Sequence, residues 1–144
     1  MTHTREWYGR WEFPEVQHGV PTKYGCVCFW PSRLQLGKYT DIGYGTLLQC
    51  EAGVIIGEEV ELGSYCSVYS VSTIDNTRGT VMIAEKACVG SHCVILPGIS
   101  IGENSLIGAG TVVTKDVPAN VVVRPDARLV YRPRKTLKSH VDVE

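Results

Sequence analysis

Aliphatic residues followed by glycine recur along the middle of the chain with a spacing of six. The pairs are Leu36-Gly37, Ile42-Gly43, Ile56-Gly57, Leu62-Gly63, Val89-Gly90, Ile101-Gly102 and Ile107-Gly108. A period of six does not line one face of an α-helix, because successive positions would be rotated by about 240° at 3.6 residues per turn. In a strand, six is a multiple of two, so each aliphatic residue returns to the same face, and glycine suits a corner. The pattern therefore predicts short strands joined by corners.

The extended six-residue frame forms three runs, which begin at Tyr24, Ile56 and Ile83. Their positions are 24, 30, 36, 42, 48 and 54, then 56, 62 and 68, and finally 83, 89, 95, 101, 107 and 113. Between residues 68 and 83 the chain advances fifteen positions where twelve would keep the phase, which predicts three extra residues in a loop over 69–82. A β-sandwich or barrel would show turns every ~8–12 residues and would not hold this phase. The frame predicts a parallel solenoid whose coils stack at roughly 4.8 Å.

We expect one domain over residues 1–144, with three parts. Residues 24–118 form the repeats, and residues 119–144 form a short basic C-terminal segment. Residues 1–23 hold four aromatic side chains, which would cap the open end of the solenoid or line an acceptor pocket. These aromatic residues are Trp7, Tyr8, Trp11 and Phe13.

Composition narrows the partners and the compartment. The chain has 144 residues, of which 44% are hydrophobic and 20% charged, and a formal net charge of −1. This balance gives no case for nucleic acid or an anionic membrane, although six basic residues between 124 and 138 could meet a phosphate. No segment predicts a signal peptide or a membrane span, so we expect a cytoplasmic protein. The six cysteines are then expected to be reduced and to fill the interior.

Residues 89–123, VGSHCVILPGISIGENSLIGAGTVVTKDVPANVVV, closely resemble the last coils of hexapeptide-repeat acyltransferases. The resemblance implies a left-handed parallel β-helix, triangular in section, with three hexapeptides in each coil. It also implies a homotrimer that binds acetyl-CoA or another acyl-CoA in the groove between neighbouring subunits. The usual Gly-Asn-Pro-Ala turn after the repeats is replaced here by Val123-Arg-Pro-Asp-Ala. The end of the coenzyme groove is therefore expected to differ.

The resemblance implies a set of cofactor-binding residues. Small corner residues let the ligand approach the backbone, and basic residues meet the phosphates, with Ser91 near the thioester. The set is Ser91, Gly108, Ala109, Gly110, Thr114, Lys115, Arg124 and Arg128. The alternative is that glycine and alanine only shape the turn and that Lys115 is a surface charge.

The loop over 69–82 points to the acceptor. Family members that act on sugar hydroxyls usually carry a histidine in this loop, and none is present here; its polar residues include Asp75, Asn76 and Arg78. The loop is similar to that of acetyltransferases acting on amino groups of nucleotide-linked sugars. We expect acyl transfer to an amino or hydroxyl group of a small acceptor, a sugar used in surface polysaccharide synthesis.

His92 is the first candidate for the general base, because it follows an inward aliphatic residue by three positions and should project toward the groove. Asp75 is the second candidate, and Asn76 would orient the acceptor or the acyl carbonyl. The alternative for His92 is a surface or trimer-contact residue. His3 and His140 lie in terminal segments expected to be mobile, and a structural role is favoured for His18.

Two other functions compete on the same fold. A metal-dependent hydratase similar to the γ-class carbonic anhydrases needs three imidazoles around its metal ion, and the repeats hold one histidine, so no metal is expected. A non-catalytic trimeric scaffold or binding protein is the other alternative.

Overall fold

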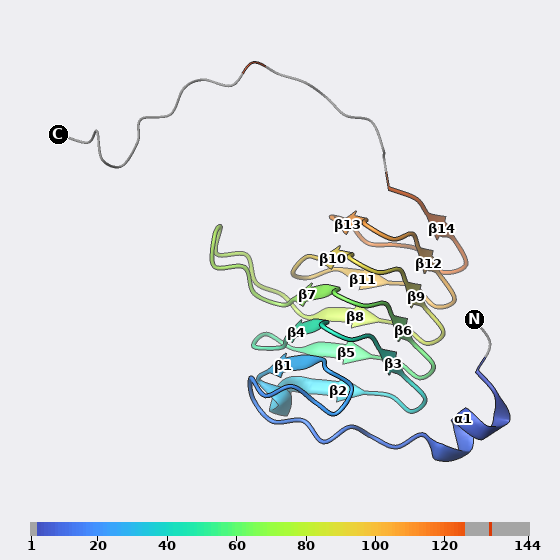
Figure 1. Cartoon of the computed structure of the whole chain (residues 1–144). Coiled ribbons are helices and arrows are strands. Elements are labelled where there is room, and N and C mark those ends of the chain that lie inside the picture. The colour runs from blue at the N-terminus through green and yellow to red at the C-terminus, as the bar shows by residue number, and fades with distance from the viewer. Residues whose placement is uncertain (1–2, 126–132, 134–144) are drawn as a thin grey trace.

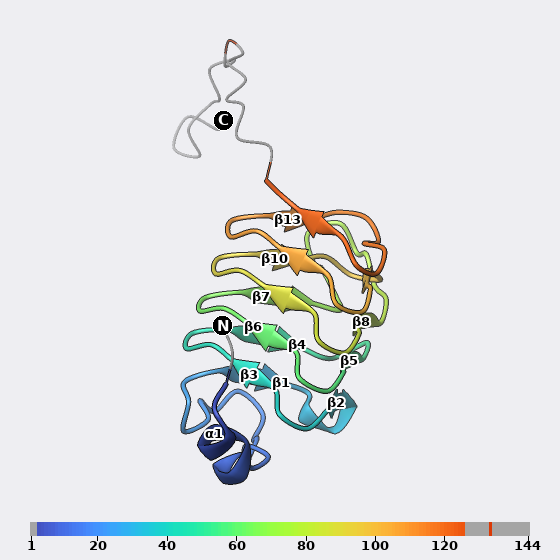
Figure 2. The ribbon, with the colours of Figure 1, turned by 90° about the vertical axis from the view of Figure 1, so that its right-hand side faces the viewer.

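The chain forms a left-handed parallel β-helix of about five coils, as predicted (Figure 1). The computed structural model describes residues 3–125 and Pro133. Its three parallel sheets make the three faces of the solenoid, and Figure 2 shows the coils stacked along one axis. Each coil contributes one strand to each sheet through most of the stack.

The strands have two or three residues each. The first sheet, in the order β1-β4-β7-β10-β13, consists of Val27–Phe29, Leu47–Gln49, Ser67–Tyr69, Val94–Ile95 and Val112–Val113. The second, in the order β11-β8-β5-β2, consists of Ser100–Ile101, Val81–Ile83, Val54–Ile56 and Leu34–Leu36. The third, in the order β14-β12-β9-β6-β3, consists of Val122–Val123, Leu106–Ile107, Cys88–Val89, Glu61–Leu62 and Asp41–Ile42. The last strand lies beyond the predicted end of the repeats at residue 118.

The core consists of aliphatic ladders, and in most coils a smaller residue lies two positions before each aliphatic one. On the first sheet, Leu48, Val68 and Ile95 are buried above one another. The matching smaller residues, Cys66 and Cys93 among them, fill the corner. All six cysteines are free, and five of them are buried, which confirms the predicted role as interior filler for these five. Cys88 is only partly buried.

The first coils are longer than the six-residue frame predicts. Leu47 pairs with both Val27 and Ser67, so these coils advance by twenty residues. The two additional residues shift the frame, and the predicted interior positions Tyr24 and Trp30 are 51% and 44% exposed. Cys28 takes the interior position instead. The frame was wrong here because cysteine at position 28 carries no aliphatic signal.

The loop between β7 and β8 is also longer than predicted. Val68 and Ile83 lie on adjacent faces of one coil, as Ile95 and Ile101 do in the next coil, where the spacing is six. The fifteen positions between 68 and 83 therefore include nine extra residues rather than three. They project from the solenoid (Figure 1).

The N-terminal segment packs against the first coils. It contains the short helix α1, Arg5–Arg10, whose first turn is capped by the Thr4 hydroxyl. Tyr8 Oη donates to Glu59 Oε1 at 2.9 Å, and Trp11 Nε1 donates to the Thr40 carbonyl at 2.8 Å. No helix in the described part of the chain is long and apolar enough to cross a membrane.

Candidate functional site

A groove of about 520 Å³ runs along the outer face of the third sheet. It begins beside β3 and passes over β6, β9 and β12, so it spans four coils. Its walls contain Asp41, Glu61 and Cys88 from the strands, and its edge contains Ser64, Ser91 and Ala109 from the corners that follow.

The floor of the groove is backbone, because glycine stands at the same corner in successive coils. A Cβ atom on Gly63 would lie 2.5 Å from the backbone nitrogen of Ser91, and one on Gly90 would lie 2.5 Å from that of Ala109. Such distances leave no room for a side chain. The column Gly43, Gly63, Gly90 and Gly108 therefore carries no side chains along the groove, so an extended ligand could lie close to the backbone.

A second hollow of about 410 Å³ continues the groove toward the C-terminal end of the solenoid. Leu106 and Gly108 line both hollows, and Val122, Arg124 and Pro125 complete the second. Arg124 lies one coil above Gly108, and a Cβ atom added to Gly108 would be 3.7 Å from the Arg124 Cα. The predicted residue Arg128 lies outside the described residues.

The structure brings three predicted site residues together in the groove, Ser91, Gly108 and Ala109, and places His92 and Gly110 next to them in the same corners. The Gly110 N–H donates to the Ser91 carbonyl at 2.9 Å, which ties the two neighbouring corners together. The edge also carries Arg124 at its upper end.

His92 is exposed at this edge and is held by its neighbours in the column of corners. Its N–H donates to the Ser64 carbonyl at 3.0 Å, and its backbone has the left-handed φ of 59°. The imidazole stacks on the ring of Tyr65, with centroids 5.5 Å apart and an interplanar angle of 15°. Tyr44 packs edge-on against Tyr65 at 5.8 Å. This aromatic column fixes the direction of the imidazole beside the groove.

The remaining predicted residues lie at a different edge of the same chain. Asp75 and Asn76 are in the projecting loop after β7, and Thr114 and Lys115 follow β13, whereas His92 precedes β10 in the same sheet. Within one chain, the first sheet separates the two groups. The structure therefore does not bring Asp75 or Asn76 to His92.

Asp75 is engaged within its own loop. Its Oδ1 accepts hydrogen bonds from the Thr77 hydroxyl at 2.8 Å and from the Thr77 N–H at 3.1 Å. These bonds, with the hydroxyl contribution largest, lower the pKa of the Asp75 carboxyl below its ordinary value. Asp75 is a poorer base for this reason, and it shapes the loop.

The sequence did not point to the residues at the N-terminal foot of the groove. Asp41 and Glu61 lie directly opposite each other on β3 and β6. The His3 side chain, expected to be mobile, is 9% exposed and its Nε2 lies 2.9 Å from Glu61 Oε1. The alternation Asp41-Ile42 and Glu61-Leu62 marks the carboxylates as outward-facing, but no local signal links them to His3.

Cys88 faces the groove between the acidic foot and the apolar upper part. It pairs with Glu61 across β6 and β9. Burial raises the pKa of the Cys88 thiol, and the Glu61 carboxylate raises it further. No group of three His, Cys, Asp or Glu side chains within residues 3–125 is arranged to hold a metal ion.

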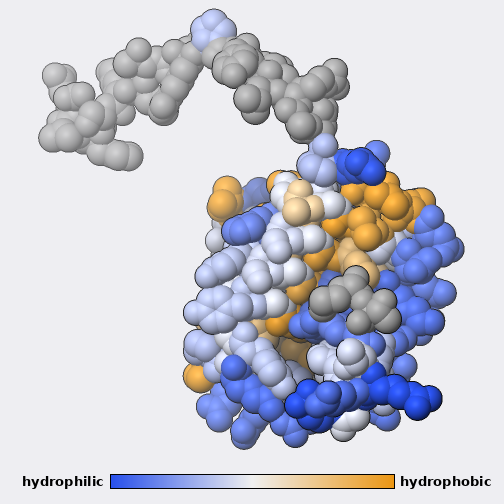
Figure 3. Space-filling view, turned by 45° about the vertical axis from the view of Figure 1, so that its right-hand side comes forward, coloured by the Kyte–Doolittle hydropathy of each residue, from blue (hydrophilic) through white to orange (hydrophobic). Residues whose placement is uncertain are grey.

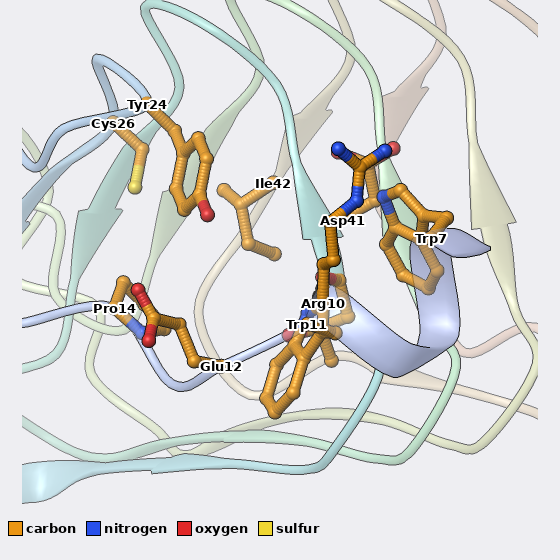
Figure 4. Close-up of a pocket in the computed structure, with 10 residues that line it drawn as sticks. Trp7, Arg10, Trp11, Glu12, Pro14, Tyr24, Cys26, Asp41 and Ile42 are labelled. Carbon is orange, nitrogen blue, oxygen red and sulfur yellow. Dashed lines mark hydrogen bonds between the residues drawn. The ribbon is translucent and has the colours of Figure 1, made fainter.

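A separate cavity of about 310 Å³ lies under the N-terminal cap (Figure 4). Trp7, Trp11 and Tyr24 provide its aromatic walls, and Arg10 and Asp41 are among its polar residues. Asp41 also lines the groove, so the two hollows share this residue.

His18 has the structural role expected of it. Its Nδ1 accepts a hydrogen bond from the Trp30 N–H at 3.0 Å, and its ring packs edge-on against Phe29 and Trp30. His140 lies outside the described residues.

Comparison with known proteins agrees with this geometry. Residues 80–115 match the family described as bacterial transferase hexapeptide (six repeats). A serine acetyltransferase of Synechococcus elongatus is 37% identical over 97 residues, which cover 63% of this chain and 40% of the relative. The chain thus spans less than two thirds of the length of this relative.

Solved structures share the solenoid. A maltose O-acetyltransferase from Clostridium difficile 630 superposes with a TM-score of 0.64 at 26% identity, covering 76% of this chain and 64% of the other. A hexapeptide-repeat acetyltransferase from Vibrio cholerae, complexed with acetyl coenzyme A, superposes with a TM-score of 0.66 at 24% identity, covering 77% and 66%. At that identity the second likeness concerns the fold. The chain carries the hexapeptide repeat of bacterial transferases on a β-helix similar to those of hexapeptide-repeat acetyltransferases.

Proposed function

We propose that the protein transfers an acetyl or similar acyl group from acyl-CoA to an amino or hydroxyl group of a small acceptor. The observation that carries this proposal is the continuous groove over the glycine column, whose upper part, from Cys88 to Ala109, lies within the segment that matches the transferase repeats. The names of the relatives, a serine acetyltransferase and a maltose O-acetyltransferase, support acyl transfer to small hydroxyl compounds. A nucleotide-linked sugar of surface polysaccharide synthesis is our proposed acceptor.

The residues of the groove fit acyl-CoA. Because the corners at Gly90 and Gly108 carry no side chains, an extended pantetheine arm could lie close to the backbone there, and Arg124 at the upper end suits the phosphates. The bound co-substrate supplies the thioester whose acyl carbon the acceptor attacks. His92, steadied by Tyr65, would accept the proton that the attacking group loses, and Ser91 would donate a hydrogen bond beside it.

We also propose that three copies assemble and that each site is shared between two of them. The two groups of predicted residues lie at different edges of one chain, and a threefold axis outside the solenoid and parallel to it can bring the edges of neighbouring copies face to face. Thr114 and Lys115 of one copy would then meet the groove of its neighbour. The free cysteines fit a reducing compartment, and we place the reaction in the cytoplasm.

Calorimetric titration with acetyl-CoA tests the proposal. We expect saturable binding near one site per chain. Ala109 is exposed in the groove and Ala119 is exposed outside it, so they provide matched variants. Ala109→Trp should weaken binding by at least ~10-fold by filling the groove, while Ala119→Trp should not. Absence of any binding heat in the unmodified protein would favour the non-catalytic scaffold.

Mixed assemblies test the shared site. His92→Ala and Lys115→Ala chains, each expected to be impaired alone, should recover activity when they are unfolded and refolded together, because one site in the mixture then has both residues intact. Light scattering gives the number of chains. Recovery would be absent if each chain held its own complete site. A screen of nucleotide sugars for the mass gain of one acetyl group would identify the acceptor.

A further inference from the structure

The outward residues of the third sheet change in character along the groove. From the N-terminal end they are Asp41, Glu61, Cys88, Leu106 and Val122, each in register with the next. The foot is therefore acidic and the upper part apolar, and Figure 3 shows hydrophobic surface toward the upper end and hydrophilic surface at the base. A ligand that fills the groove meets opposite polarity at its two ends.

The two carboxylates at the foot lie directly opposite each other on neighbouring strands. Like charges in this position repel each other, so the pair gains most from a cation between or beside them. Asp41 and Glu61 keep 43% and 25% of their side-chain surface exposed. They are thus accessible enough to bind a group from outside and sheltered enough to hold it.

His3 is aimed at this pair from within the cap, where its side chain is almost wholly buried. Its Nε2 lies 2.9 Å from Glu61 Oε1 and 3.6 Å from Asp41 Oδ2. The ring stacks on Trp7 with centroids 3.7 Å apart. Nevertheless, Nε2 is buried and makes no contact of hydrogen-bond geometry. A nitrogen that is close to two carboxylates but poorly aligned with both is held weakly, so a cationic ligand can displace it.

We propose that Asp41 and Glu61 form a subsite for a cationic group, and that the ammonium group of the acceptor displaces His3 from it. The subsite itself stands on the geometry of His3 and the carboxylates. Its assignment to the acceptor rests on the proposed function. The apolar upper part and Arg124 take the co-substrate, so the acidic foot is left for the acceptor.

With an amine as acceptor, the transfer makes an amide and releases a thiol. The acceptor nitrogen forms the new bond to the acyl carbon while the bond from that carbon to sulfur breaks. Of the two protons that the ammonium loses, one passes to His92 and from there to solvent, and the other goes to the departing thiolate. Asp41 and Glu61 hold the amine and take no proton in this scheme.

The rate at which charged reagents modify Cys88 measures the charge of the subsite, and this measurement does not require the acceptor to be known. It lies opposite Glu61 in the groove, and the other five cysteines are at most 5% exposed. We would compare its modification by an ethylammonium and an ethylsulfonate methanethiosulfonate reagent, with peptide mapping by mass spectrometry. The ratio of the two rates removes the influence of Glu61 on thiolate formation, because that influence is common to both reagents.

We expect the cationic reagent to modify Cys88 at least ~10-fold faster than the anionic one. The double variant Asp41→Asn with Glu61→Gln should reduce this ratio to below about 3, and His3→Ala should raise the cationic rate by vacating the subsite. Glu103→Gln, which removes an exposed carboxylate outside the groove, is the control and should leave the ratio unchanged. Equal rates for the two reagents in the unmodified protein would overturn the subsite.

Two protection measurements separate this inference from the proposed function. Acetyl-CoA should shield Cys88 if it occupies the groove, and charge selectivity without such shielding would retain the subsite while refuting the co-substrate. If acetyl-CoA shielded Cys88 but the two reagents reacted at equal rates, the co-substrate would be supported and the subsite refuted. Glucosamine should slow the cationic reagent more than glucose does, since the two sugars differ only in the amino group. Equal effects of the two sugars would rule out recognition of an ammonium.

Discussion

Replacing Gly90 by alanine should damage the solenoid at the floor of the groove. The added Cβ would lie 2.5 Å from the backbone nitrogen and 2.7 Å from the Cα of Ala109, where ordinary contact begins at 3.4 Å. Because the obstacle is backbone, no rotamer change relieves it. The two corners must separate by nearly 1 Å, which stretches the 2.8 Å hydrogen bond from the Gly90 N–H to the Ile107 carbonyl.

Overpacking costs about 1–3 kcal/mol, and a weakened buried hydrogen bond adds about 1 kcal/mol, so we expect a loss of about 3 kcal/mol. For a chain of this size each kcal/mol lowers the Tm by roughly 3 °C, which gives a fall of about 9 °C in thermal unfolding followed by circular dichroism. Gly9→Ala is the control, because nothing lies within 4 Å of its Cβ position in α1. Gly9→Ala should leave the Tm unchanged or raise it slightly, because alanine favours the helix. If Gly90→Ala melted within about 1 °C of the unmodified protein, coil spacing would not be the reason for the glycine column.

Three further predictions concern catalysis, the core and the loop. His92→Ala should lower turnover with a hydroxyl acceptor by at least ~100-fold, and a nearly unchanged rate would remove His92 as the base. Thr46 is fully buried, and its Oγ1 donates to the Gly63 carbonyl at 2.8 Å, so Thr46→Val should cost about 2 kcal/mol in urea unfolding while Thr46→Ser costs less. The hydrogen bonds from Thr77 lower the pKa of the Asp75 carboxyl. Their contribution to loop stability should be fully present at pH values above the ordinary pKa of aspartate, and it should be lost as the pH falls through the lowered pKa. Thr77→Val should raise the pKa of Asp75, as measured by NMR titration.

The six-residue period predicted most of the core, because the coils from Ile83 to Val113 contain no insertion. It failed where the coils are longer. Between Leu48 and Ile56 both Val54 and Ile56 are aliphatic and buried, so the sequence offers two phases and only the stacking of coils selects the second. At the first coil the interior residue is Cys28, which sequence reasoning treats as neutral filler.

In the candidate site, too, some residues were predictable from the sequence and others were not. Ser91, Gly108 and Ala109 occupy equivalent corners of regular coils, so a motif read along the chain places them together. His3 and Glu61 are separated by almost sixty residues and meet only because the cap folds back over the first coils. The periodic pattern does not extend into the N-terminal segment, so nothing in the sequence pointed to the acidic foot of the groove.

The unequal lengths of the coils have a consequence for how this fold can change. Ser67 pairs with Val94, and Leu47 pairs with Ser67, although the first pair is separated by twenty-seven residues and the second by twenty. The rungs on either side keep their register whatever the excursion between them. Since doubling the length of a flexible loop costs only about 0.6 kcal/mol, the segment between β7 and β8 can be exchanged among homologues as a cassette. Such an exchange would leave the buried residues of the rungs on either side in place.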